Sequence, residues 1–142
     1  MKQCLKLIMA LLCISSFVQT SAFAAVTAKC PDGDFLKKII AENATNYEEH
    51  TFTVDSQKVG WHIESQGGQL SSFSSSFSSW EKATGFFRED NPNLTCSVGG
   101  FQAVGFLPDT YSYQSCTLDG EKLEKYKDYL CKDANSCELV CS

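Results

Sequence analysis

The sequence has few basic residues, and this shortage limits the partners that we expect. Across 142 residues, 12 Lys and Arg stand against 17 Asp and Glu. A domain of this sign repels phosphate backbones and anionic membrane surfaces. Nucleic acid and anionic lipid headgroups are therefore not expected partners, and we interpret the acidity as a contribution to solubility.

The common catalytic and metal-binding motifs are also missing. The sequence contains no G-x-S-x-G elbow, Walker loop, G-x-G-x-x-G, H-E-x-x-H or EF-hand loop. It contains no C-x-x-C, so thiol oxidoreductase activity lacks its motif. The two acids around Gly33 lack the continuation of a calcium loop and are better explained as helix caps. We expect no cofactor and no bound metal.

Only one long apolar run is present, and it lies at the N-terminus. Two lysines precede this run, Leu7–Val18, and Ala22-Phe23-Ala24 after it fits the small-x-small rule of signal-peptide cleavage. The run is shorter than the roughly 20 residues that a membrane-spanning helix needs. We predict that residues 1–24 are a signal peptide, with Ala25 as the alternative cleavage point. The mature chain is then secreted or periplasmic and is not inserted in a membrane.

Cysteine is the residue type that the sequence has in excess. Two of its eight cysteines leave with the predicted leader. The other six allow fifteen pairings, which the sequence alone does not resolve. An oxidising compartment favours disulfides over zinc thiolates, and the paired C-x2-C spacing of structural zinc sites is absent. We predict a disulfide-stapled domain over residues 25–142, with both chain ends fastened to a sheet. The six are Cys30, Cys96, Cys116, Cys131, Cys137 and Cys141.

Alternating apolar residues predict about five antiparallel strands in hairpins. Residues 50–64 alternate on both sides of a polar turn at 55–57, which indicates two half-buried strands. Gly99-Gly100 separates the next two apolar runs and favours a tight hairpin turn. Residues 111–118 are expected to form a fifth strand that ends at Asp119-Gly120.

Helical spacing predicts two or three helices beside these strands. A helix capped by Asp32 or Asp34 is expected to run toward residues 43–46. A second is expected from Leu70 through the serine-rich segment toward Phe87, and a third after Gly120, where Leu123, Tyr126 and Leu130 are spaced as a stripe. The predicted fold class is therefore α+β, a single disulfide-stapled domain.

The two histidines are the only candidates for acid–base chemistry. His62 and Glu64 lie two residues apart on a predicted strand, so that their side chains share a face. There they could bind a metal or exchange protons. His50, at the start of the partner strand, is the third candidate catalytic residue. The alternative, which we favour, places both histidines on the solvent face with a purely structural role.

The aromatic residues of the serine-rich segment are candidates for binding. Phe73, Phe77 and Trp80 recur at helical spacing among serines. Because aromatic residues dominate binding hot spots, these three could form an exposed recognition face. The alternative, which we favour, is that they fill the core between a helix and the sheet.

The order of several short features resembles a bacterial group. Cys30-Pro31 opens the mature chain, Gly60-Trp61 lies on a strand, a Phe-rich segment follows, and Cys96 comes after it. In this order the chain resembles small exported proteins of unknown function from Legionella- and Coxiella-like bacteria. It departs from them at Ser97-Val98, where an aromatic residue is expected. The resemblance implies export and a disulfide, and it brings no catalytic residues.

These features favour an exported, non-enzymatic binding protein. We expect a monomer that contacts another protein or a glycan. The alternatives are a small secreted hydrolase that uses His62 and Glu64, and a secreted inhibitor of other enzymes.

Overall fold

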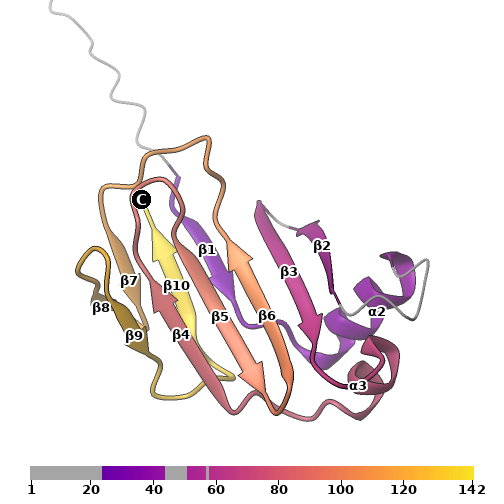
Figure 1. The fold of residues 1–142 in the computed structure, drawn as a ribbon. Helices are drawn as coiled ribbons and strands as arrows, with labels where there is room; N and C mark the ends of the chain where they lie inside the picture. Colours follow the sequence, from indigo (N-terminus) through magenta and orange to yellow (C-terminus); the bar gives the residue numbers. More distant parts are fainter. Residues whose placement is uncertain (1–23, 44–50, 57) are drawn as a thin grey trace, which may run out of the picture.

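A computed structural model describes residues 24–43, 51–56 and 58–142, with the side chains of 43 and 51–56 left out of the description. The described residues form two helices and two antiparallel sheets, which confirms the predicted α+β class (Figure 1). The helices are α2 (Gly33–Asn43) and α3 (Leu70–Ser76). In spatial order, the first sheet contains β1 (Val26–Lys29), β10 (Glu138–Cys141), β7 (Cys116–Leu118) and β8 (Glu121–Lys122). The second contains β2 (Thr51–Ser56), β3 (Val59–Ser65), β6 (Phe101–Phe106), β5 (Asn93–Val98), β4 (Lys82–Phe86) and β9 (Asp128–Leu130).

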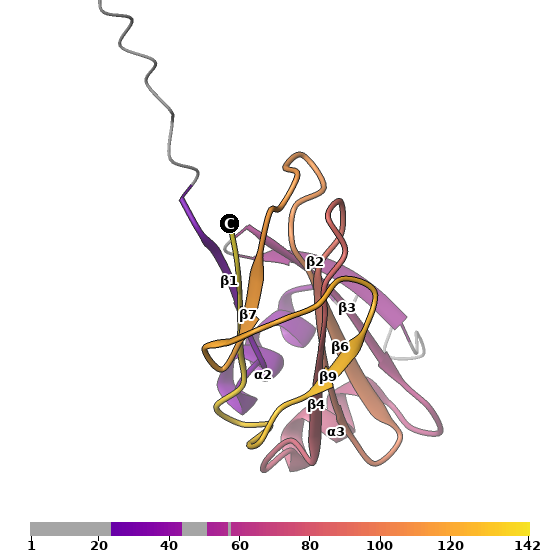
Figure 2. The same cartoon turned by 90° about the vertical axis from the view of Figure 1, so that its left-hand side faces the viewer.

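The two sheets pack face to face around one core. Figure 2 shows the four-stranded sheet and α2 on the same side of the six-stranded sheet. Residues alternate between buried and half-exposed along β3, β5 and β6, as expected for strands with one face on a core. Buried side chains from both sheets and from α2 belong to a single cluster, which includes Leu139, Leu94, Ile63 and Leu36.

Local signals set α2 and the hairpins. Asp32 Oδ1 accepts a hydrogen bond from the Phe35 amide at 2.7 Å, so this residue is the predicted helix cap. The hairpins β2–β3 and β5–β6 are confirmed, and Gly99 in the second turn has a φ of +54°. Asp119 and Gly120 both have positive φ at the β7–β8 turn, the conformation that a two-residue hairpin requires.

Gly105 allows the largest inner side chain of β3 to lie against β6. The residue is paired with Trp61 across the two strands. A Cβ atom at Gly105 would lie 2.7 Å from Trp61 Cη2, closer than carbon atoms approach in folded proteins. The absence of a side chain at this position therefore makes room for the buried indole ring.

We expect Gly105→Ala to lower the free energy of unfolding by about 1–3 kcal/mol, because an extra methyl group overpacks the core. Gly68→Ala is the control, since a Cβ there meets only Ser65 Oγ at 3.8 Å. That variant should change stability by less than about 0.5 kcal/mol. Urea unfolding followed by tryptophan fluorescence measures both. Equal midpoints for the two variants would contradict the packing of Trp61 on β6.

The six predicted disulfide cysteines form three pairs. Cys30–Cys96 joins the residue after β1 to β5, and Cys116–Cys141 joins β7 to β10. Both chain ends are thus fastened to the sheets, with Cys96 and Cys116 on the sheet side, as predicted. The third pair, Cys131–Cys137, closes a short loop before β10.

The predicted helix from Leu70 toward Phe87 is wrong beyond Ser76. The chain becomes extended at Phe77, and Lys82–Phe86 is strand β4. Serine hydroxyls explain the early end, because those of Ser74, Ser75 and Ser76 bond to backbone carbonyls three or four residues earlier. Serine competes with the backbone in this way and weakens a helix.

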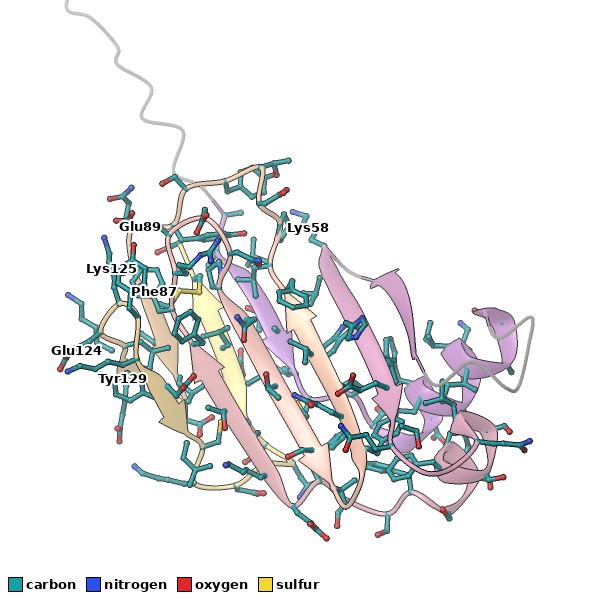
Figure 3. The ribbon with its side chains drawn as sticks, in the orientation of Figure 1. Lys58, Phe87, Glu89, Glu124, Lys125 and Tyr129 are labelled. Carbon is teal, nitrogen blue, oxygen red and sulfur yellow. A yellow bond between two sulfur atoms is a disulfide. The ribbon has the colours of Figure 1, made fainter. Side chains whose placement is uncertain are left out.

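The predicted final helix is also wrong, and the predicted fifth strand is shorter than expected. Only Cys116–Leu118 of residues 111–118 is strand, and residues 121–130 form β8, β9 and a connection between them. The Tyr126 amide donates to the Phe87 carbonyl, and Tyr126 has a φ of +61°, which no α-helix allows. Lys125 pairs with Glu89 and lies 5.8 Å from the Phe87 ring centroid (Figure 3). Contacts with distant strands therefore override the helical spacing.

Candidate functional site

The six-stranded sheet has a second face, which points away from the core. The other sheet and α2 both lie on its inner side (Figure 2). Phe73 stacks on Phe101, a β6 residue that is 1% exposed and belongs to the core. The side chains on the opposite side of the sheet keep partial or full exposure. This surface, the outer face, faces the viewer in Figure 1.

Strand register arranges the outer face in three cross-strand rows. Over the five strands whose side chains are described, most members are small polar or apolar residues, and the acidic and basic ones are two carboxylates and one lysine. This described part of the face is therefore close to neutral on a chain that is acidic overall. The rows are Gly60, Phe106, Asn93, Phe86 and Asp128; His62, Val104, Thr95, Thr84 and Leu130; and Glu64, Gln102, Ser97 and Lys82.

The predicted pair of His62 and Glu64 lies on the outer face. His62 Nε2 is 3.8 Å from Glu64 Oε2, and both side chains are about one-third exposed, at 38% and 32%. Their cross-strand neighbours on β6 are Val104 and Gln102, and neither of these side chains is a nucleophile. The third candidate, His50, lies outside the described residues.

A hollow of about 480 Å³ opens at one end of the outer face. Phe106 and Gly60 belong to both, and they are directly paired, so that the β3 residue opposite Phe106 has no side chain. Figure 3 shows Lys58 at the end of β3, next to the loop that follows β6. The volume lies within the range typical of small-ligand sites. The lining consists of Lys58, Val59, Gly60, Asn91, Phe106, Leu107, Pro108 and Asp109.

The polar groups of the hollow come from three separate segments. Lys58 is in the β2–β3 turn with a φ of +70°, Asn91 is in the loop before β5, and Asp109 follows β6. The Leu107 amide donates to the Pro92 carbonyl, which holds the last two segments together. A donor, an acceptor and an amide thus line the same hollow as Phe106.

A second group of potential ligands is a disulfide beside a carboxylate. Asp119, Cys131 and Cys137 place ligand atoms within 4.8 Å of one another. The two sulfurs are bonded to each other and are not thiolates, the form that binds metals. Asp119 accepts a hydrogen bond from the Glu138 amide instead.

The three predicted aromatic binding residues lie against the core rather than on an exposed face. Trp80 is 4% exposed, and its indole nitrogen donates to the Pro31 carbonyl at 2.6 Å. Phe73 is half-buried and stacks on Phe101, with ring centroids 3.7 Å apart. Phe77 is also half-buried and contacts Trp80 at 4.8 Å. The three residues therefore do not form an exposed aromatic face.

The residues of the hollow were missed from the sequence. Along the predicted strand, buried residues alternate with Gln102, Val104 and Phe106. This alternation indicates a strand with one buried and one exposed face. Lys58, Asn91 and Asp109 carry no such signal, because they lie in turns and loops.

Comparison of the chain with known proteins gives this site no precedent. No protein-family model, no curated protein and no solved structure matches the chain. In the described ranges, no helix is both long and apolar enough to cross a membrane.

Proposed function

We propose that the protein is an exported binding protein that contacts its partner through the outer face and the hollow at its end. The observation that carries this proposal is the hollow itself, which is lined by polar residues from three segments and by the half-buried Phe106. Three disulfides favour an oxidising compartment, which supports export.

Two valines offer a matched test of the surface. Val104 lies at the centre of the outer face, and Val140 lies on the solvent side of β10 in the other sheet. Both are half-buried and both lie on strands that have a neighbour on each side. The fold should tolerate a long charged side chain at either position. Only the side chain at position 104 should block a partner on the outer face.

We expect Val104→Arg to reduce binding at least about tenfold, the effect of losing one well-placed contact, while Val140→Arg leaves it unchanged. The full sequence is expressed so that any leader can be processed, and the fluorescently labelled product is applied to an array of oligosaccharides and purified proteins. Circular dichroism checks that both variants fold. No retention on any spot, or equal losses in the two variants, would contradict the proposal.

A hydrolase that uses His62 and Glu64 is the second candidate, favoured by the 3.8 Å approach of the two side chains. An activity on ester or glycoside substrates that disappears in His62→Gln, in a folded protein, would replace binding as the function.

A further inference from the structure

We propose that the occupant of the outer face is an uncharged oligosaccharide, with one sugar ring seated in the hollow against Phe106. This inference rests on the proposed binding function and names the class of its ligand. Size, charge and chemistry of the surface each support a sugar over a protein.

The outer face is small for a protein partner. Neighbouring strands are about 4.8 Å apart and alternate residues about 6.6 Å, so the six strands of the sheet with three rows span about 24 by 13 Å between backbones. With its margins the patch covers roughly 600 Å², against about 800 Å² on each partner of a standard protein interface. A chain of a few sugar rings fits this area.

The composition of the outer face lacks the usual anchors of a protein interface. None of the described residues in its three rows is Trp, Tyr or Arg, the types that dominate protein hot spots. Hydroxyl and amide side chains occupy the middle of the sheet instead, at Thr84, Thr95, Ser97, Asn93 and Gln102. Such groups both donate and accept hydrogen bonds, as sugar hydroxyls do.

The hollow offers no net charge to attract a strongly charged ligand. Lys58 only donates hydrogen bonds, Asp109 only accepts them, and Asn91 does both. Because Lys58 and Asp109 carry opposite charges, an ion attracted by one of them is repelled by the other. A sugar hydroxyl can donate to Asp109 while its neighbour accepts from Lys58. The apolar C–H face of the same ring can then lie on Phe106, since aromatic rings offer a flat apolar surface.

Paired substitutions in the hollow and away from the outer face test this assignment. Phe106→Leu removes the ring at the hollow, and Phe35→Leu makes the same change at a half-buried ring on α2, off the outer face. Asp109→Asn removes the acceptor charge in the hollow, and Asp34→Asn makes the same change at an exposed position on α2. All four residues are partly or fully exposed, so these changes should leave the fold intact.

The probe is an array of neutral and anionic oligosaccharides together with purified proteins. We expect retention on neutral oligosaccharides, reduced about tenfold by Phe106→Leu and by Asp109→Asn, and by less than about threefold in the two controls. Circular dichroism accompanies each variant.

The outcomes separate this inference from the proposed function. Retention only on proteins or only on anionic glycans, lost in Val104→Arg, would overturn the oligosaccharide and leave the binding function standing. Self-association in light scattering that disappears in Val104→Arg would assign the face to a second copy of the chain and overturn it equally. Equal losses in the hollow variants and their controls would remove the hollow from the proposal, and no retention at all would overturn both proposals.

Discussion

Replacing Cys30 and Cys96 together with alanine is expected to lower the free energy of unfolding by about 4 kcal/mol. The two cysteines are 66 residues apart, and the cross-link removes the entropy that so long a loop has in the unfolded chain. The loss is a large fraction of the 5–15 kcal/mol by which domains are typically stable. Cys96 is fully buried on β5, so the bond also holds the segment after β1 against the core. Guanidinium unfolding under non-reducing conditions measures the change.

The control for this variant is the double alanine replacement of Cys131 and Cys137. These residues are 6 apart, and the same loop-entropy argument gives about 2 kcal/mol for their cross-link. Removing both cysteines of a pair avoids a free thiol in either variant. If the short loop cost as much as the long one, loop entropy would not be the origin of the stabilisation.

Features with a local cause were predictable from the sequence. The hairpin β5–β6 follows from two apolar runs on either side of two glycines, and α2 follows from its cap at Asp32 and its apolar spacing. In both cases the residues that determine the element lie within it or next to it. The partners of Cys30 and Cys116 were different, since fifteen pairings satisfy the sequence equally and only the fold selects one.

The helix predicted from Leu70 does not continue into Lys82–Phe86, and the helix predicted after Gly120 does not form, because distant contacts decide those segments. The Cys131 amide donates a hydrogen bond to the Ala83 carbonyl, and β4 pairs with both β5 and β9. None of these partners lies within the helical window that predicted the segment. Tyr126 and Leu130, two members of the supposed apolar stripe, are 64% and 65% exposed.

The candidate site shows the same division. The shared face of His62 and Glu64 follows from strand alternation, which the sequence displays. The hollow instead joins residues from 58 to 109 through the β3–β6 pairing, and no pattern within one segment indicates that Lys58, Asn91 and Asp109 meet.

Trp80→Ala is expected to lower the free energy of unfolding by about 3–5 kcal/mol, the range for removing a large buried aromatic side chain. Its ring lies 5.7 Å from that of Phe101 and 4.8 Å from that of Phe77, so truncation leaves a cavity where α3 and β6 meet. Its backbone exchanges two hydrogen bonds with the Asn135 side chain, which holds the Cys131–Cys137 loop at the same place. Thermal and urea unfolding measure the loss.

Trp80→Phe separates the ring from its hydrogen bond. Phenylalanine keeps most of the packing but leaves the Pro31 carbonyl without the indole donor, which should cost about 1–3 kcal/mol. Ser79→Ala, at the exposed neighbouring position, should stay within about 0.5 kcal/mol. Because Trp80 supports the fold from the core side of the sheet, Trp80→Phe should retain full binding on the oligosaccharide array. If this variant lost binding with little loss of stability, Phe73, Phe77 and Trp80 would belong to the recognition surface, as their spacing suggested.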